Sequence, residues 1–353
     1  MEGSAAVEGP NERWWPAIRR IDVIGVVLVL AFAAWAAWVA RVTDTDGAHV
    51  VWLLLALLIT AAAARWATFL HGTAAPALIV VAVLVYAIAT ADGSPRELGD
   101  AGSRAAAGAL LAIGTGAAAL VVVRLRTWWP RAIFAIIAAG LAGLTWKTGS
   151  TGASFIALGA LLVMVVLLGF PMRERRWVVV WPGLVAVLAL LGTVAFAALG
   201  LPEGLRGPDP ERVGGWWAAL DIVSESPWYG AGPGATDTVA AGSGIEHEPL
   251  RIAAETGYIG ALLLLAILWW ALAWVARPGG GPGSVVAGFV LAAAIAHACF
   301  AAIWQVPAVP LALAALAGTA SLRGGDAAWR LHALWDRVTG DPSPVEEAPT
   351  GGS

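Results

Sequence analysis

The feature that most constrains this chain is a series of apolar runs, most of them long enough to cross a lipid bilayer as a helix. We place ten runs, at about residues 21–40, 49–65, 74–91, 105–123, 132–146, 153–170, 178–199, 257–276, 285–304 and 306–322. About 20 helical residues span the hydrocarbon core at a rise of about 1.5 Å each. Backbone groups in lipid must be paired within the protein, so we expect an all-α integral membrane protein with about ten transmembrane helices.

The composition supports this fold class. Of the 353 residues, 59% are hydrophobic and only 13% are charged, which is too few charged side chains to cover a water-soluble globule of this size. This composition therefore excludes a water-soluble globular protein. The single cysteine, Cys299, lies inside an apolar run, so no intramolecular disulfide can form.

The arginines and the one lysine are distributed unevenly along the chain. With the N-terminus in the cytoplasm, the inner segments hold Arg13, Arg19, Arg20, Arg65, Arg124, Arg126, Arg131, Arg173, Arg175, Arg176, Arg277, Arg323, Arg330 and Arg337. The outer segments hold only Arg41, Arg96, Arg104, Lys147, Arg206, Arg212 and Arg251. By the positive-inside rule, we expect a multi-pass protein of the cytoplasmic membrane with both termini in the cytoplasm.

This orientation divides the chain into five parts. They are a cytoplasmic tail at 1–20, transmembrane helices 1–7 at 21–200, an extracytoplasmic loop at 201–256, transmembrane helices 8–10 at 257–322, and a cytoplasmic tail at 323–353 with a short amphipathic helix. The pair Arg19-Arg20 also suits a twin-arginine export signal. The nine apolar runs that follow it favour an uncleaved first span instead.

The outer loop begins with a predicted interfacial helix. Asp209 can cap a helix whose first residue is Pro210. Its apolar stripe predicts a helix that lies flat on the membrane, and consists of Val213, Trp216, Trp217, Leu220 and Val223. Arg212 lies within about 40° of Trp216 around this helix and suits a lipid-linked phosphate or diphosphate. The alternative is an arginine that reaches ordinary lipid headgroups.

The glycine-rich run at residues 230–234 predicts a turn. It resembles a phosphate-binding loop only in composition. No strand precedes it, and Pro233 lacks the backbone amide that such a loop would use.

The end of the outer loop holds the candidate for acid–base chemistry. A helix is predicted to begin near Pro249 and to run straight into the eighth span, which places Glu246, His247 and Glu248 just outside the membrane. A histidine between carboxylates, which raise its basicity, could act as a general base; a solvated loop histidine is the simpler alternative. One histidine with flexible carboxylates lacks the ligand spacing of a metal site, so no metal and no cofactor is expected.

Three other positions could contribute charge. Arg251 and Glu255 are four residues apart and predict a helix-surface ion pair. Lys147, at the outer end of the fifth span, could add a positive charge above the membrane or serve as a topological anchor. His297 lies inside the ninth span, where an ionisable group is a functional candidate, although a neutral histidine bonded between helices is the favoured explanation.

These segments together resemble the O-antigen ligase and O-antigen polymerase family. The resemblance rests on Arg212 with Trp216, on Ser226-Pro227, on Gly230-Ala-Gly-Pro-Gly234, on Glu248-Pro-Leu-Arg-Ile-Ala-Ala-Glu-Thr-Gly257-Tyr-Ile-Gly260, and on Thr148-Gly-Ser-Thr-Gly152 before the sixth span. The close matches cover about residues 145–275. The resemblance implies a GT-C-like helical fold and a metal-independent glycosyltransferase.

The same resemblance implies the substrates and the site. Family members transfer a glycan from a polyprenyl diphosphate to a hydroxyl group of an acceptor outside the membrane. The acceptor is a glycan or a glycolipid. Arg212 takes the diphosphate-binding role, with Lys147, Arg251, Trp216 and Glu255 as further expected binding residues.

Two positions depart from the family pattern. The family's histidine position holds Glu246, next to His247, so either residue is the expected base. The family's arginine before the sixth span is Thr151 here, which leaves Lys147 as the nearest cation. The alternative function is a diverged, non-catalytic member, or a membrane protein that binds or transports a lipid-linked glycan. Nucleic acid is not an expected partner.

Overall fold

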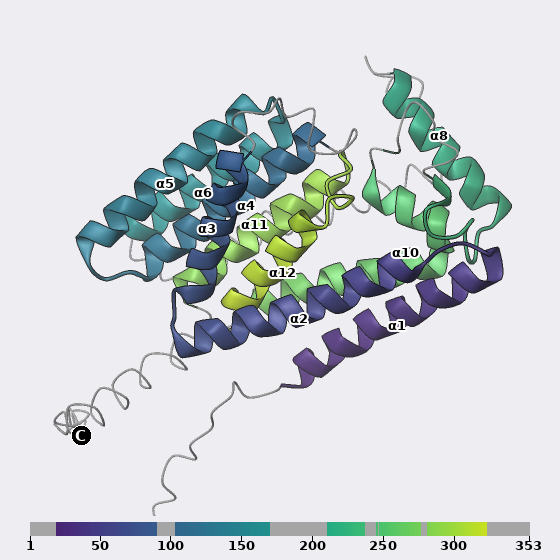
Figure 1. Cartoon of the computed structure of the whole chain (residues 1–353), viewed down its shortest axis with the longest axis horizontal. Helices are drawn as coiled ribbons and strands as arrows, with labels where there is room; N and C mark the ends of the chain where they lie inside the picture. The colour runs from purple at the N-terminus through teal and green to yellow at the C-terminus, as the bar shows by residue number, and fades with distance from the viewer. Residues whose placement is uncertain are drawn as a thin grey trace, which may run out of the picture.

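The structure is a computed structural model of the whole chain, and it describes residues 19–89, 103–169, 210–236, 245, 247–276 and 281–322. These residues fold as α-helices joined by short connections (Figure 1). The helices are α1 (Arg20–Thr43), α2 (Ala48–Leu70), α3 (Ala74–Ala89), α4 (Ser103–Arg124), α5 (Trp128–Lys147), α6 (Thr151–Gly169), α8 (Pro210–Glu225), α10 (Glu248–Val275), α11 (Pro282–Ala298) and α12 (Ala308–Ala320). The all-helical class expected from the sequence is confirmed within the described residues.

Nine of the ten expected spans coincide with these helices, and the seventh, at 178–199, lies outside the described residues. Within the described part, six helices are long and apolar enough to cross a membrane: α1, α2, α4, α5, α6 and α10. The helices α3, α11 and α12 are apolar but shorter. The chain therefore has the features of a multi-pass membrane protein.

The ninth expected span is shorter than its apolar run. We predicted a helix to residue 304, but α11 ends at Ala298. The amide groups of Cys299 and Phe300 donate hydrogen bonds to the carbonyls of Ala296 and His297, respectively, which closes the last turn. Apolar composition continues past the helix end because the following connection is itself packed in the protein, with Ile303 fully buried.

Helix α4 is the centre of one group of helices. It packs against α3, α5, α6, α11 and α12, and nearly all of its length is buried. Small residues make this possible: a side chain at Gly116 would collide with Val290 of α11. Close approach of small residues is the usual basis of helix packing in membranes, where lipid is as apolar as the protein interior.

A second group contains α1, α2, α10 and α12. Helix α1 packs along α10 and α2, and α12 packs along α2 (Figure 1). Helix α12 also contacts α4, and α11 contacts both α10 and α4, so the two groups form one bundle. Helix α8 lies at one end of the molecule and packs against α10.

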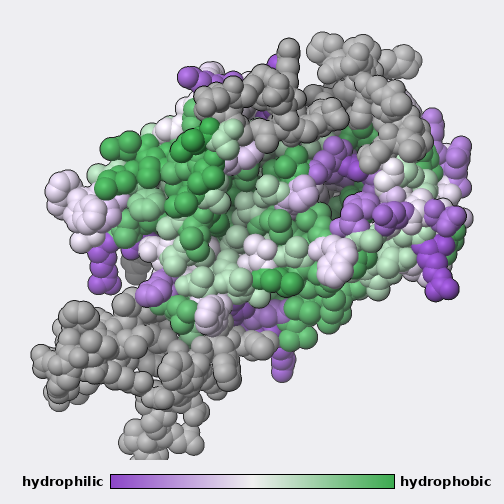
Figure 2. Space-filling view, in the orientation of Figure 1, coloured by the Kyte–Doolittle hydropathy of each residue, from purple (hydrophilic) through white to green (hydrophobic). Residues whose placement is uncertain are grey.

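The outer surface of the bundle is largely hydrophobic (Figure 2). Large apolar side chains project outward from α2, α3 and α5, among them Trp52, Ile88 and Ile136, each about 70% exposed. Such a surface is unfavourable in water. It is the surface that a bilayer would cover.

A buried ion pair joins three helices at the end of the bundle where α1 begins. Arg65 of α2 contacts Asp22 of α1, with 2.9 Å between Nη1 and Oδ1, and Trp274 of α10 donates to the same carboxylate oxygen at 2.7 Å. At the same end, Arg124 donates to the carbonyls of Gly72 and Thr319. Basic residues thus gather at the end that the sequence assigns to the cytoplasm.

We predict that Arg65→Met lowers the melting temperature of the purified protein markedly. The substitution removes the Arg65 cation from the partly buried Asp22 carboxylate, a loss that falls between the ~1 kcal/mol of a surface pair and the ~3–5 kcal/mol of a fully buried one. Arg41→Gln is the matched control because Arg41 is exposed on α1. Unfolding is followed by intrinsic tryptophan fluorescence in detergent, and equal melting temperatures for the two variants would contradict a stabilising role for this pair.

Candidate functional site

His247 forms the N-cap of α10. Its Nδ1 accepts a hydrogen bond from the backbone amide of Leu250 at 3.1 Å, and Pro249 occupies the first turn, where its missing amide is not needed. The imidazole is almost fully buried and lies edge-to-face against Trp216 of α8, with 5.5 Å between ring centroids. The cap thus positions the histidine between α8 and α10.

Burial lowers the pKa of His247 to about 4. His247 precedes α10 and lies outside the membrane-spanning helices, and its imidazole is neutral at pH 7. Within the described residues the expected rise in basicity is not seen, because Glu248 accepts a hydrogen bond from Trp304 and desolvation dominates; Glu246 lies outside the described residues. Since Nδ1 accepts from Leu250, the neutral ring carries its proton on Nε2 and donates from that atom.

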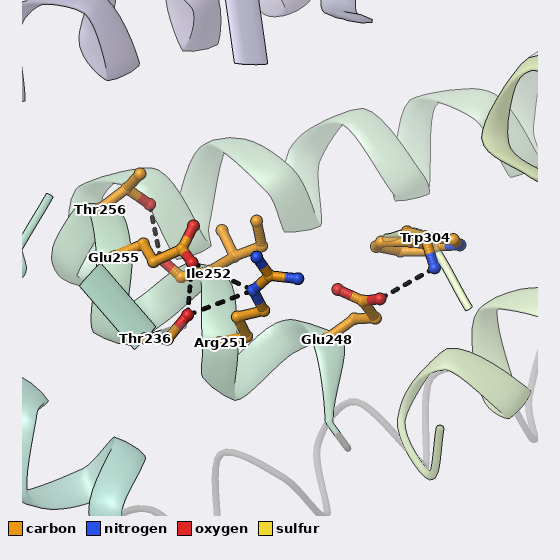
Figure 3. Close-up of polar contacts among 7 residues, drawn as sticks. All are labelled: Thr236, Glu248, Arg251, Ile252, Glu255, Thr256 and Trp304. Atoms are coloured by element: carbon orange, nitrogen blue, oxygen red, sulfur yellow. Dashed lines mark hydrogen bonds and ion pairs between the residues drawn. The ribbon is translucent and has the colours of Figure 1, made fainter. Parts of the chain in front are cut away.

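Arg251 and Glu255 form the predicted i, i+4 ion pair, with 3.0 Å between Nε and Oε1. Glu255 is buried and Arg251 is partly buried, so the pair is not on the open helix surface; Thr236 joins it from the preceding connection. The Thr236 hydroxyl donates to Oε1 of Glu255 at 2.5 Å and accepts from Nε of Arg251 at 3.3 Å (Figure 3). These contacts fix the orientation of the guanidinium.

Glu248 is a second buried carboxylate in the same segment. Its Oε1 accepts a hydrogen bond from the backbone amide of Trp304 at 2.8 Å, which ties the start of α10 to the connection between α11 and α12. Figure 3 shows the terminal nitrogens of Arg251 turned toward Glu248, with Glu255 on the other side of the guanidinium. One cation is therefore held between two acidic side chains.

Helix α10 is interrupted at Gly257, which has a φ of 68° and a ψ of −173°. The expectation of a straight helix from Pro249 into the membrane is wrong at this residue. The connection after α8 replaces the broken helical hydrogen bonds: Tyr258 donates to Pro227, while Ala231 and Gly232 donate to Ala254 and Glu255, at 2.8–3.0 Å. Backbone hydrogen bonds between α10 and the connection after α8 therefore stabilise the break.

The turn predicted at residues 230–234 is confirmed, since Gly230, Gly232 and Gly234 all have positive φ. Two of its amides are engaged by α10, so they are not arranged as a phosphate cradle. Gly230 and Gly257 are also required sterically. A side chain at Gly230 would meet the backbone of Ala254, and one at Gly257 would meet the backbone of Trp228.

The structure brings together some of the predicted site residues. His247, Trp216, Arg251 and Glu255 all lie where α8 packs on the first turns of α10. Arg212 lies in α8, four residues before Trp216, and its side chain is outside the described residues. Glu246 and the capping residue Asp209 also lie outside the described residues.

Lys147 does not join this group. It is exposed in the last turn of α5, which packs against α4 and α6, whereas the cluster belongs to α10, which packs against α1, α8 and α11. His297 packs against Gly152 at the start of α6, and its Nε2 has no hydrogen-bond partner among the described residues.

The apolar stripe of α8 packs differently from our expectation. Val223 and Ala219 are buried with Leu250 and Ala254 of α10, and Trp216 and Leu220 pack against the same cluster. Among the stripe residues whose side chains are described, only Trp217 is exposed; Val213 is outside that part. The described part of the stripe therefore packs mainly on α10, which offers a complementary apolar face at this position.

Sequence reasoning did not identify two participants. Thr236 lies in a stretch of small residues with no chemical pattern, and Trp304 contributes its backbone amide, which no side-chain pattern reveals. Glu248 was noted only as a neighbour of His247. Within the described residues, no group of three or more His, Cys, Asp or Glu side chains is arranged to hold a metal ion.

Comparisons of this chain with known protein families, with curated proteins and with solved structures found no match.

We predict that the stability of the protein falls as the pH is lowered from about 6.5 to about 4, in part because of His247. Its pKa is lower in the folded state than the ordinary 6.5, so the unfolded chain binds more protons in this range. His247→Asn keeps an N-cap acceptor but does not titrate. The variant should show a smaller loss of melting temperature between pH 7 and pH 4.5, and an unchanged pH dependence would contradict the prediction.

We also predict that Gly230→Ala is far more damaging than Gly234→Ala. Both glycines have φ above 70°, so both substitutions carry the left-handed cost of about 1–2 kcal/mol. Only at Gly230 does the new methyl group collide with α10, since nothing lies within 4 Å of the corresponding position at Gly234. Limited proteolysis and melting temperature measure the difference; similar behaviour of the two variants would show that the docked connection is not held as described.

Proposed function

We propose that this chain is a membrane glycosyltransferase that transfers or polymerises a polyprenyl-diphosphate-linked glycan onto an acceptor hydroxyl at the outer face of the cytoplasmic membrane. The observation that carries the proposal is the group formed by the buried Glu248 and Glu255 and the partly buried Arg251 beside His247, in a strongly apolar chain. Buried ionisable groups in membrane proteins are costly and usually serve function. The resemblance of the surrounding motifs to the O-antigen ligase and polymerase family supplies the reaction class.

The cations in this proposal bind the diphosphate of the donor. Arg251 is fixed through its Nε by Glu255 and Thr236, and its terminal nitrogens are directed away from that pair. Arg212, four residues before Trp216 in α8, supplies a second guanidinium. Negative charge on the diphosphate grows as its bond to the sugar breaks, so cations held in place stabilise the transition state more than the bound donor.

The acceptor hydroxyl attacks the anomeric carbon of the donor sugar. A new carbon–oxygen bond forms, the bond to the diphosphate breaks, and the hydroxyl proton passes to a base of the protein. The hydrogen bond from Leu250 occupies the lone pair of His247 Nδ1, which favours a carboxylate, Glu246 or Glu248, as proton acceptor and His247 as a hydrogen-bond donor to a sugar or phosphate oxygen. His247 becomes a base only if its ring releases that amide.

The proposed function also requires a defined orientation in the membrane and two substrates. The end of the bundle with Arg65 and Arg124 faces the cytoplasm with both termini, and residues 201–256 lie outside. The helices adopt a GT-C-like arrangement with ten spans. Trp216 packs beside the donor site and Lys147 contributes only long-range positive charge. The partners are the lipid-linked donor, a glycan or glycolipid acceptor and the bilayer; no metal or other cofactor takes part.

A second candidate function is a diverged protein that binds or transports a lipid-linked glycan without chemistry. It is favoured by the pairing of Arg251 with Glu255 and by the engaged Nδ1 of His247, since both groups already have partners inside the protein. This candidate predicts saturable donor binding without product.

The test is product formation by the purified protein in nanodiscs, with polyprenyl-diphosphate oligosaccharide extracted from its host. We expect wild type to extend or transfer the glycan, and Arg251→Gln to lower the rate about 10²–10³-fold, the usual loss for one transition-state donor. Arg251→Lys keeps the charge, and Arg41→Gln removes an exposed arginine as control.

Rates are compared only among variants whose melting temperatures match wild type. A wild-type rate in Arg251→Gln would remove the proposed role of this cation. Donor binding that saturates without any product, in wild type and variants alike, would favour the second candidate function.

A further inference from the structure

Four exposed aromatic residues surround the break in α10. Trp38 comes from α1, Trp228 and Tyr229 from the connection after α8, and Tyr258 directly follows Gly257. Their exposed fractions are 47%, 66%, 38% and 46%. We call these four residues the aromatic collar. Single exposed aromatics are ordinary, but four gathered from three segments at one level form a surface.

The collar is held as a unit by contacts between its segments. Trp38 and Tyr229 meet edge-to-face, with 6.4 Å between ring centroids. Trp35, which packs against Trp38, donates its indole N–H to the carbonyl of Thr256 at 2.9 Å, directly before the break. These contacts therefore join α1, the connection after α8 and α10 next to the break.

The connection suits a nonpolar environment although it is not helical. The three backbone hydrogen bonds between residues 227–232 and α10 pair the groups that the break would leave open, and Gly230 donates to Ser226. Non-helical backbone is tolerated at membrane depth only where its polar groups are satisfied by protein. An exposed loop in water would not require this pairing.

The collar also continues the lipid-facing surface of the bundle. Tyr258, Leu262 and Trp269 share one face of α10, and the last two are each about 65% exposed. Along α1 the exposed side chains change from Val27 and Leu30 through Trp38 to Arg41 and Val42, and the exposed acids Asp44 and Asp46 follow the helix end. Apolar, aromatic and then acidic side chains follow the order of hydrocarbon, headgroup and water.

We propose that the aromatic collar binds phospholipid and thereby holds residues 226–232 and the Gly257 break in the headgroup region of the outer leaflet. Gly232 donates to the carbonyl of Glu255, whose carboxylate holds Arg251. The collar therefore sets the depth of the segment that carries Arg251 to that of lipid phosphate; Arg251 lies seven residues, about two helical turns, before Tyr258, with the break between them.

This depth determines which substrates reach the site. A diphosphate that is anchored in the leaflet arrives at Arg251 by lateral diffusion, whereas a water-soluble sugar nucleotide would have to enter the headgroup layer. This last step rests on the proposed function; the placement of the collar does not.

The depth of the collar is measurable with nitroxide labels in vesicles of phosphatidylethanolamine and phosphatidylglycerol. In a Cys299→Ala background, single cysteines replace Trp228, Tyr258, Leu262 and Ser224, the last an exposed residue of α8. Accessibility to oxygen, which concentrates in lipid, is compared with accessibility to a water-soluble nickel complex. We expect Ser224 in water, Trp228 and Tyr258 at a common headgroup depth, and Leu262 about 6 Å deeper, from four residues at about 1.5 Å.

Nickel accessibility at Trp228 and Tyr258 equal to that at Ser224 would overturn the proposal. A photoreactive benzoyl-phenylalanine at Trp228 gives an independent readout that preserves an aromatic side chain, with the exposed Asp221 of α8 as the matched control site. We expect phospholipid adducts at Trp228 and none at Asp221; adducts absent from both sites would also overturn it.

Neither measurement uses a glycan. A transferase that is active with a water-exposed collar would refute this inference alone, and a collar at headgroup depth in a protein without transferase activity would refute the proposed function alone.

Discussion

The backbone hydrogen bonds around Gly257, which join α10 to the connection after α8, are the interactions on which this end of the bundle depends. A helix that entered the membrane unbroken would leave Ala254 and Glu255 bonded within α10 and would offer no attachment to the connection after α8. The break frees these carbonyls, and Ala231 and Gly232 bind them. This docking brings the connection back to α10, where Thr236 meets Glu255 and Arg251.

Charged side chains are buried or partly buried at both ends of the bundle, but the two groups have different surroundings. Asp22 and Arg65 satisfy one another with help from Trp274, and Trp270 anchors the same corner through the carbonyl of Ile21. At the other end, one guanidinium faces two carboxylates. The first arrangement is closed and joins helices; the second leaves excess acidic character beside a neutral histidine, which is an arrangement suited to binding and proton transfer rather than to stability alone.

The sequence predicted most of the helices because membrane spans are defined by local composition. The ion pair between Arg251 and Glu255 was also predictable, since both residues lie on one helix four positions apart. The state of His247 was not predictable. Whether a histidine is solvated, acts as a base or caps a helix depends on its burial and on which atom its Nδ1 meets, and here Trp216 and Leu250 decide it. Likewise, the stripe of α8 revealed an apolar face but not its partner, because lipid and the face of α10 are equally apolar.

By itself, the sequence determined the all-helical class, the approximate positions of nine helices within the described residues, the turn at residues 230–234 and the concentration of polar groups near 201–256. Each of these follows from local hydropathy, helix capping or glycine content. Only the tertiary structure decided that the turn docks on a broken helix, that Thr236 and the amide of Trp304 hold the acidic residues, and that His247 is buried and neutral. These outcomes depend on contacts between segments far apart in the chain, and local sequence patterns do not encode which surfaces meet.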